Sequence, residues 1–363
     1  MKQHNVTYQR LGDYIREVDV RNKDLKVTTL LGVSISKEFI PSIANTIGTD
    51  MSSYKIVEQD QFAYGPVTSR NGEKVSIALY RGIEQAIISQ AYSVFEIINT
   101  RQLLPEYLMM WFRRLEFDRY ARFKSHGSAR EVFSWEEMCD VCLPIPPIAR
   151  QREIVSEYKM LTDRICFNNS IISALESTAQ ALYRKMFVDD IDKDNLPTGW
   201  RIGTIGEVAN ISSGKTCTNK QIERDIKYLY PVAGASGVIG YSPDYNQIDK
   251  LLTTGRVGTL GVVNRYNEKI YTADNVLVIK SKYYEYCYQL LRSLDYVEIT
   301  KGGVQSLITQ TDVSSYEITI PATESINDFE KQASMIYSHI DKIIYENNKL
   351  TELQSLLLAK MGQ

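Results

Sequence analysis

Apolar residues recur with strict four-three spacing in two stretches of the chain, and each stretch provides ten successive positions of this kind. In the first stretch, these positions are Ile154, Tyr158, Leu161, Ile165, Asn168, Ile172, Leu175, Ala179, Leu182 and Met186. In the second, they are Phe329, Ala333, Ile336, Ile340, Ile343, Asn347, Leu350, Gln354, Leu357 and Met361. Each set forms a coiled-coil seam, narrower than the apolar stripe of a helix packed on a globular core. The pattern predicts two long helices of roughly 50 Å.

Each seam contains one asparagine, Asn168 at the fifth position and Asn347 at the sixth. If the helices pair antiparallel with matched ends, the fifth position of one meets the sixth of the other. In a parallel pair each asparagine would face an isoleucine, and a buried amide without a partner costs about 1 to 3 kcal/mol. Because polar seam residues set register in this way, the seams predict an antiparallel pair within one chain.

The chain also contains an internal repeat. The stretch GSAREVFSWEEMCDVCLPIP, residues 127–146, aligns with GGVQSLITQTDVSSYEITIP, residues 302–321, and the register of 175 continues without a gap to the second seam. At the start of each copy, Leu11 matches Ile205, which lies 194 positions later, so the second copy is 19 residues shorter in its middle. Repeated ends with different middles suit a scaffold that presents two different surfaces, although drift of loops after a duplication explains the length change equally well.

Each copy mixes short strands with a helix. The first copy contains the expected strands YKIVE, FAYG, KVSIALY and AIISQAYSVFEI and the helix PEYLMMWFRRLEFDRYARF. The second contains KLLTTG, TLGVVNRY and KIYTADNVLVIKS and the helix YYEYCYQLLRSL. In both, strands are followed by a helix, a glycine loop and a final strand. The order predicts an α+β fold with two domains at 1–143 and 201–320, long helices at 144–187 and 321–363, and a linker at 188–200.

The bulk composition is that of an ordered globular protein, with 44% hydrophobic and 24% charged residues. The five cysteines and three histidines lack the spacing of a zinc site, so we expect reduced, packed thiols and no metal. No apolar leader or stretch of eighteen apolar residues is present, which predicts a cytoplasmic protein without a membrane span. The net charge of −2 gives no indication for or against a nucleic-acid partner.

The polar loops between the expected elements carry side chains that suit phosphate or base contacts. The candidates are Arg70, Lys74, Arg122, Lys124, Ser128, Arg130, Lys215, Arg256, Lys301 and Gln305. Several surround the glycine loop SHGSAR, and others lie in the equivalent loop TKGGVQS. Taken singly, each is more often an ordinary solvated side chain, so the argument rests on their occurrence at equivalent places in both copies.

With the repeat, the seams and the loops in place, the chain resembles the specificity subunits of type I restriction-modification systems. LPIPPIARQREIV, residues 143–155, resembles the family's signature at the start of its conserved helix. YPVAGASGVIGYSPDYN, LLTTGRVGTLGVVN and YTADNVLVIK resemble a target-recognition domain of the same family. The second helix start, TIPATESINDFEKQ, departs from the pattern because it lacks the second proline, which leaves its contacts open.

The resemblance implies that each target-recognition domain reads one half of a split, asymmetric site in double-stranded DNA, and that the paired helices fix the gap between the halves. It also implies two modification subunits docked on the outer helix faces, through exposed side chains such as Arg152, Arg164 and Lys185. Restriction subunits would join for cleavage. The chain itself would bind no cofactor, since S-adenosylmethionine, ATP and Mg²⁺ would be held by these partners.

Catalytic motifs are missing from the sequence. SSGKT lacks the upstream glycine of a phosphate-binding loop, NLPTGW is not the catalytic tetrapeptide of an adenine methyltransferase, and SPDYNQIDK lacks the acid-x-lysine of a nuclease. We therefore favour a non-catalytic binding subunit over an enzyme. A coiled-coil scaffold without DNA specificity and a segment of a fused restriction-methylation enzyme remain as alternatives.

Overall fold

The computed structural model describes residues 8–42, 48–69, 71–72, 74–127, 130–192, 194–257, 261–299 and 307–362, without the side chain of Val297. The chain forms two compact units. Unit 1 comprises Met1–Asn168 and Glu346–Gln363, and unit 2 comprises Asn169–Tyr345. Both units mix helices and sheets, which confirms the expected α+β class.

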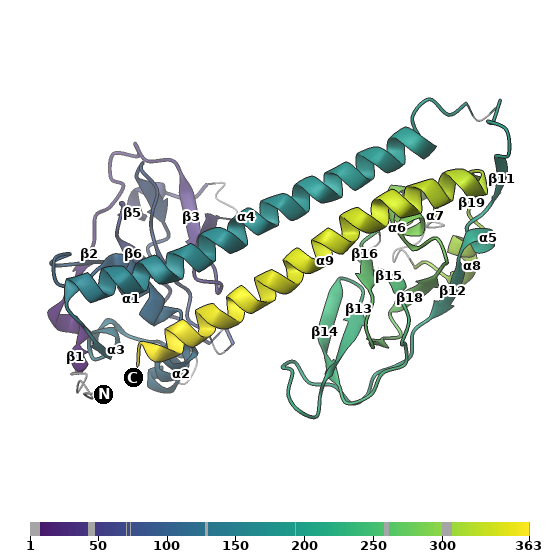
Figure 1. Ribbon diagram of the computed structural model, residues 1–363. Helices are drawn as coiled ribbons and strands as arrows, with labels where there is room; N and C mark the ends of the chain where they lie inside the picture. The colour runs from purple at the N-terminus through teal and green to yellow at the C-terminus, as the bar shows by residue number, and fades with distance from the viewer. Residues whose placement is uncertain are drawn as a thin grey trace. The chain divides into compact units, whose positions relative to one another are not determined.

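Two long helices supply segments to both units (Figure 1). They are α4, Ile148–Phe187, with 40 residues, and α9, Thr323–Lys360, with 38 residues. At 1.5 Å per residue each is roughly 60 Å long. Pro146 and Pro147 precede the first helix, where a missing backbone donor and a fixed φ are tolerated.

In unit 1 the segments of the two helices run antiparallel. Asn168 donates from Nδ2 to Oδ1 of Asn347 over 2.8 Å, and Gln354 donates from Nε2 to Oγ1 of Thr162 over 2.8 Å. The pair that lies nearer the N-terminus of α4 thus lies nearer the C-terminus of α9, so the two helices point in opposite directions. The two asparagines share a layer, as the antiparallel seam predicts.

In unit 2 the remaining segments also run antiparallel. The ring of Phe329, near the start of α9, lies 5.8 Å from that of Tyr183 and 5.5 Å from that of Phe187, both near the end of α4. Ala179, Tyr183 and Ile340 are buried in the same apolar cluster. Helix pairing therefore contributes to the core of this unit.

The side chains expected to pair the helices are buried or half-buried along both helices. In unit 1 they are Ile154, Leu161, Ile165, Asn168, Asn347, Leu350 and Leu357. In unit 2 they are Ile172, Leu175, Ile336, Ile340 and Ile343. The periodicity of burial follows the four-three spacing of the sequence.

Unit 1 contains two four-stranded sheets and a ribbon. The first sheet has the order β2 (Ile15–Val18), β9 (Ser93–Ile97), β6 (Phe62–Tyr64), β7 (Ile77–Leu79). The second has the order β4 (Phe39–Pro41), β3 (Leu30–Val33), β8 (Ala86–Ile88), β5 (Lys55–Val57). The ribbon pairs β1 (Tyr8–Arg10) with β10 (Cys142–Pro144). The helices are α1 (Pro105–Phe112), α2 (Leu115–Lys124) and α3 (Trp135–Cys139), with 3₁₀ turns at Leu11–Asp13 and Met51–Ser53.

Unit 2 repeats this plan with a smaller second sheet. Its four-stranded sheet has the order β12 (Asn210–Ser213), β18 (Val276–Lys280), β15 (Leu251–Gly255), β16 (Val263–Tyr266). The three-stranded sheet has the order β14 (Gly237–Ser242), β13 (Tyr230–Gly234), β17 (Tyr271–Thr272). The ribbon pairs β11 (Arg201–Thr204) with β19 (Glu317–Ile320). The helices are α5 (Ile205–Val208), α6 (Tyr284–Ser293), α7 (Tyr296–Ile299) and α8 (Gln310–Ser314).

Two elements predicted in the first copy are each divided in the structure. The stretch expected as one strand at 86–97 is interrupted by a turn at 89–92, where Tyr92 N donates to Ser89 O. The expected helix at 105–123 breaks at Arg114, whose backbone is extended with ψ 142°. The Arg114 guanidinium stacks on Trp111 at 4.2 Å and is buried, so packing of this side chain accompanies the break.

A side chain from each long helix holds the N-terminal end of a helix in its own unit. In unit 1 the buried Gln151 accepts a hydrogen bond from Leu104 N, just before α1, over 2.9 Å. In unit 2 Glu330 accepts from Tyr286 N, in the first turn of α6, over 2.7 Å. Ile326 stands at the repeat position of Gln151, so Glu330 performs this role one turn later. The second copy therefore departs from the signature in the residue that it uses, but a backbone N–H at the N-terminal end of the domain helix still has a side-chain acceptor.

The expectation of packed thiols is wrong for two cysteines. None of the five, all of which lie in the described ranges, forms a disulfide, but Cys142 on the ribbon and Cys166 on α4 are exposed. Cys166 lies off the seam, next to Ile165, so the helix turns its side chain outward. Within the described ranges, no helix is long and apolar enough to cross a membrane. Nor do the residues described there include three or more potential ligands grouped to hold a metal ion.

Candidate nucleic-acid interface

Two loops far apart in the sequence of unit 1 form one surface. The first follows β6 at residues 66–72, and the second is the glycine loop, residues 125–132. Thr68 N donates to Glu131 O over 2.9 Å, and the Thr68 hydroxyl donates to Ser125 Oγ over 2.9 Å. Val67 and Val132 form an antiparallel bridge. The structure thus joins the two regions from which the first set of contact candidates was chosen.

The glycine loop has a backbone that requires glycine at its start. Gly127 has φ +136°, and a Cβ there would lie 2.1 Å from Arg130 O. The loop is closed by paired backbone hydrogen bonds between His126 and Val132, with N to O distances of 3.1 and 2.9 Å. A side chain at residue 127 would therefore displace the turn that carries Arg130.

The candidate cations of unit 1 differ in their ion pairs. Arg122 forms an ion pair with Glu131, and Lys124 Nζ lies 3.2 Å from Glu137 Oε2. The hydrogen bond to Glu137 raises the pKa of Lys124. Lys74 and Arg130 are exposed and have no ion pair with any other described residue. They are the cations most available to a phosphate group.

The segment that follows the second glycine loop pairs with the chain after β15, while the loop itself, residues 300–306, lies outside the described residues. Val257, two residues after β15, bridges to Leu307, and Ile308 N donates to Arg256 O over 3.0 Å. In unit 1 the corresponding bond runs from Phe133 N to Pro66 O over 2.8 Å. The same pairing of two segments therefore occurs in both units, with different side chains, and it places Arg256 beside Ile308.

A turn between β17 and β18 brings Lys215 near Arg256. Lys215 N donates to Thr272 O over 2.9 Å, and Arg256 N donates to Asn275 O over 3.1 Å. A Cβ on Gly214 would lie 1.9 Å from Ala273 O, so this close approach requires glycine. Lys215 is exposed and Arg256 is half-buried. The structure therefore gathers two candidates that are 41 positions apart in the sequence.

A further loop of unit 2 was not identified from the sequence. Residues 219–228 are fastened to β14 by two backbone hydrogen bonds between Gln221 and Tyr241. Asp225 shapes its turn by accepting from Tyr228 N over 2.7 Å and Lys227 N over 2.8 Å, and these bonds lower the pKa of Asp225. Ile222 and Ile226 are 88% and 97% exposed.

This loop also presents the exposed cations Lys220, Arg224 and Lys227. Because Glu223 and Asp225 lie among them, the loop is nearly neutral in sequence and did not stand out. The detectable signal was the pair of isolated isoleucines in a charged run without a periodic apolar partner.

Of the candidate contact residues predicted from the sequence, Arg70, Ser128, Lys301 and Gln305 lie outside the described residues.

These features define a class of protein: a duplicated α+β domain in which the same sheet plan and the same pairing of segments occur in each copy, with a long helix after each copy. Residues 197–355 match the family model of the type I restriction modification DNA specificity domain. The match spans the second copy and most of the second long helix.

Curated relatives extend the similarity over most of the chain. The specificity subunit of the type I restriction enzyme HindI from Haemophilus influenzae is 21% identical over an alignment of 412 positions, which covers 88% of this chain and 89% of that protein. The MjaIX specificity subunit from Methanocaldococcus jannaschii is 22% identical over an alignment of 307 positions, which covers 73% of this chain and 70% of that protein. The chain is thus similar to type I specificity subunits along most of its length.

The fold agrees with this relationship. The crystal structure of the type I restriction-modification S subunit from M. genitalium matches with a TM-score of 0.57 and 12% identity, covering 100% of this chain and 98% of that one. The chain is therefore similar in sequence to type I specificity subunits and shares its fold with this S subunit.

Proposed function

We propose that the chain is the DNA sequence-specificity subunit of a type I restriction-modification complex. The domains at 1–143 and 201–320 act as target-recognition domains, each reading one half of a bipartite, asymmetric site in double-stranded DNA. The observation that carries the proposal is the repeated pairing of two segments, with bridges at Val67 and Val132 and at Val257 and Leu307, built with different side chains. One scaffold with two different surfaces suits a protein that reads two unlike sequences.

In this proposal the helices at 144–187 and 321–363 set the gap between the half-sites, and 188–200 is the linker that returns the chain to the second domain. A length of roughly 60 Å exceeds one turn of B-DNA, roughly 34 Å. The contact residues are drawn from both loop surfaces. Lys74 and Arg130 bind in the first half, and Lys215 and Arg256 bind in the second, together with Arg70, Ser128, Lys301 and Gln305. The paired cations Arg122 and Lys124 contribute less.

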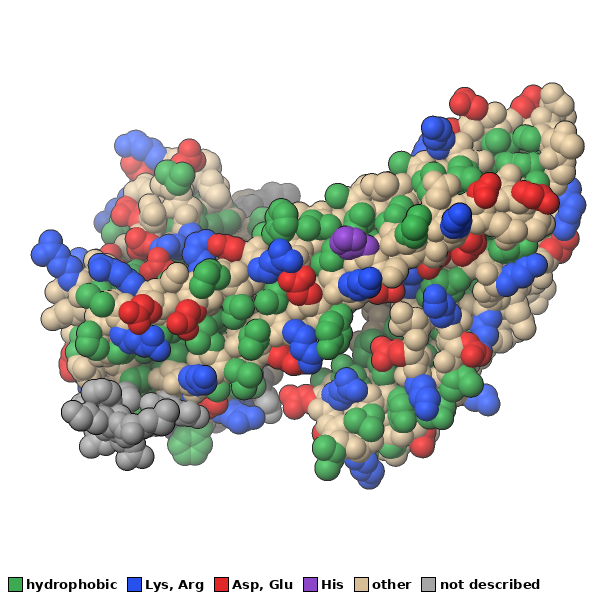
Figure 2. Space-filling view, in the orientation of Figure 1, with side chains coloured by type: hydrophobic (Ala, Val, Ile, Leu, Met, Phe, Trp, Pro, Cys, Tyr) green, Lys and Arg blue, Asp and Glu red, His purple; other side chains and the backbone are tan. Residues whose placement is uncertain are grey.

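The helices also dock the partner subunits. Figure 2 shows hydrophobic side chains among charged ones on the visible face of the helices. Met160 and Phe167 on α4 are exposed, and so are Met335 and Leu356 on α9. Apolar side chains exposed within a charged surface suit contact with another protein. We assign this surface, with Arg152, Arg164 and Lys185, to two modification subunits, which restriction subunits then join.

The chain contributes recognition and no catalysis. S-adenosylmethionine is held by the modification subunits, and ATP and Mg²⁺ by the restriction subunits, so this chain needs no cofactor of its own. The complex works in the cytoplasm, where its DNA substrate is found.

Mapping methylated adenines in cellular DNA, after expression of this chain with its modification subunits, tests the proposal. We expect one motif with two specified halves and a constant gap. A continuous motif would contradict the two-domain arrangement. Binding of random-sequence duplex that weakens with rising salt would separate this function from that of a protein-only scaffold.

A further inference from the structure

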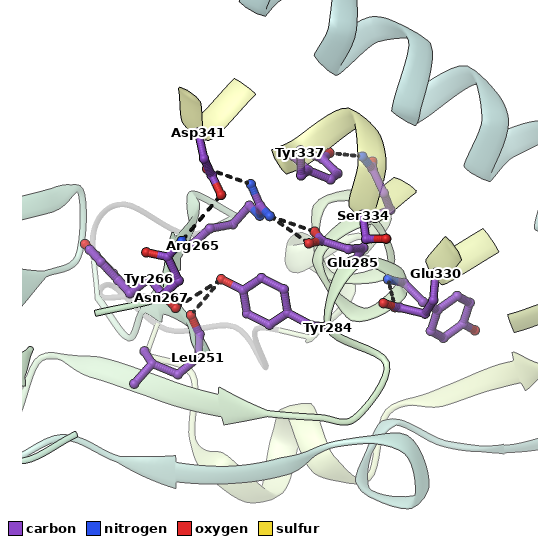
Figure 3. A network of polar contacts seen from close by, with 12 residues as sticks. Leu251, Arg265, Tyr266, Asn267, Tyr284, Glu285, Glu330, Ser334, Tyr337 and Asp341 are labelled. Carbon is purple, nitrogen blue, oxygen red and sulfur yellow. Dashed lines mark hydrogen bonds and ion pairs between the residues drawn. The ribbon is translucent and has the colours of Figure 1, made fainter. Parts of the chain in front are cut away.

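Unit 2 contains a cluster of charged and aromatic side chains where its sheet and α6 meet α9 (Figure 3). Arg265 on β16 donates from Nη2 to both carboxylate oxygens of Glu285 on α6, over 2.8 and 2.9 Å. Its Nη1 lies 3.7 Å from Oδ1 of Asp341 on α9. The guanidinium carbon lies 3.9 Å from the ring centroid of Tyr337, also on α9. One side chain thus connects the sheet, the domain helix and the long helix.

The centre of this cluster is shielded from water, whereas its edge on α9 is more open. The side chain of Arg265 is 15% exposed and that of Glu285 is 4% exposed, while that of Asp341 is 43% exposed. On α9, the hydroxyl of Tyr337 accepts a hydrogen bond from Gln289 Nε2 of α6 over 2.6 Å. A rotation of the domain on α9 would break this hydrogen bond and move Arg265 away from Tyr337 and Asp341, so the arrangement resists small rotations. The planar guanidinium adds a fixed direction through its two hydrogen bonds and its stacking.

The equivalent place in unit 1 is built differently. Phe62 pairs with Leu79 in the first sheet as Leu252 pairs with Arg265 in the second, so Leu79 occupies the position of Arg265. Thr162 occupies the position of Tyr337 in the long-helix repeat. Leu79, Met109 and Thr162 line a cavity of about 770 Å³, and its wall also carries an ion pair in which Arg81 Nη2 lies 2.6 Å from Glu106 Oε1. The side chains of this pair are 50% and 37% exposed, so unit 1 has an exposed pair beside a cavity where unit 2 has the buried arginine.

We propose that Arg265 is a positioning residue that fixes the angle of the second recognition domain on α9 and thereby restricts the gap length that the protein accepts between half-sites. The inference rests on the proposed function, and it assigns gap selectivity to a domain contact in addition to helix length. A domain free to rotate on its helix would place its recognition loops at more than one distance along the duplex. The half-site read by that domain would stay the same, because none of the cluster residues is a proposed contact residue.

The test compares methylated sites in genomic DNA from cells that express the modification subunits with the wild-type chain or with Arg265→Leu. Genomic DNA serves as the probe because it contains both half-sites at every gap length. For the variant we expect the same half-sites and a broader set of gaps. The methylated fraction at gaps one base pair longer or shorter should rise about tenfold, which corresponds to about 1.4 kcal/mol of lost discrimination.

Arg201→Leu is the matched control. It removes an arginine of the same unit from an exposed ion pair, in which Arg201 Nη2 lies 2.7 Å from Glu207 Oε2. This control should keep the wild-type gap. A merely structural role of Arg265 would lower methylation equally at all gap lengths, and that result would overturn the inference.

If circular dichroism shows that Arg265→Leu does not fold, Arg265→Lys and Asp341→Asn take over the test, since each keeps part of the cluster. We expect Arg265→Lys to restore gap selectivity only partly, because an ammonium cannot form the planar, two-bonded contact. An unchanged gap in these folded variants would likewise overturn the inference. Failure of the wild-type complex to methylate any bipartite motif would instead contradict the proposed function.

Discussion

Asn168 donates a hydrogen bond to Asn347 across one layer of the paired helices, over 2.8 Å. Asn168→Leu would leave the Asn347 carbonyl without this donor in a largely apolar seam. We expect the free energy of unfolding to fall by about 1 to 3 kcal/mol, measured by urea denaturation. In the double variant with Asn347→Leu, both polar groups are gone, so most of the lost stability should return. A double variant as unstable as the single one would show that the amide pair does not set this layer.

Arg130 and Lys124 provide a matched test of the first loop surface, since each substitution removes one positive charge. Arg130 is exposed and has no described ion pair, whereas Lys124 Nζ lies 3.2 Å from Glu137. Arg130→Ala should reduce the slope of log affinity against log salt by about 1, as expected for one lost phosphate contact. Lys124→Ala should have a smaller effect. Equal changes in slope would remove the distinction between paired and available cations.

Burial raises the pKa of Glu285 to about 7, with a contribution from the charge of Glu330, while Arg265 and Lys250 oppose the rise. Because the carboxyl titrates near 4.5 in the unfolded chain, the folded state binds the proton more tightly. The stabilisation by this proton is present below about pH 4.5 and is lost as the pH rises through about 7.

Glu285→Gln should therefore flatten the pH dependence of the unfolding free energy between pH 5 and about 7. Urea denaturation of both proteins at several pH values measures the difference. Glu207→Gln is the control, since hydrogen bonds from Arg201 lower the pKa of the exposed Glu207, whose effect lies at lower pH. A wild-type slope in the Glu285 variant would disprove the assignment.

A deletion of seven residues from each helix tests the spacer role. Residues 162–168 and 347–353 are opposite segments of the seam, and removing one heptad from each keeps the apolar positions in phase and leaves the Arg265 cluster intact. The helices shorten by roughly 10 Å, so the gap between half-sites should contract by about three base pairs. Methylation mapping should find both half-sites unchanged. An unaltered gap would show that the helices do not measure the distance.

Sequence reasoning succeeded where a pattern is periodic or repeated. The long helices, the antiparallel direction and the shared asparagine layer follow from the spacing of the seam residues. The element order of the two copies follows from their alignment. The DNA contacts stay predictions, since they depend on what binds the loops. The domain boundaries stay predictions as well.

Other features were not predictable because they depend on contacts between distant segments. Arg265 resembles any strand cation in sequence, and its role emerges only when Glu285, Tyr337 and Asp341 meet it. The hairpin of β13 and β14 was not identified as a pair of strands, because its glycines interrupt the alternation of apolar residues. The break at Arg114 depends on its stacking with Trp111, which helix propensity does not encode.

Unit 2 is one uninterrupted segment of the chain, Asn169–Tyr345. The chain enters and leaves it at neighbouring places, because Asn168 is hydrogen-bonded to Asn347. Two genetic crossovers at adjacent points of the structure would therefore exchange this unit complete with its own core and its share of both helices. If the chain has the proposed function, a lineage that carries such a gene would acquire a new half-site in a single recombination event while the other half of its target is inherited unchanged.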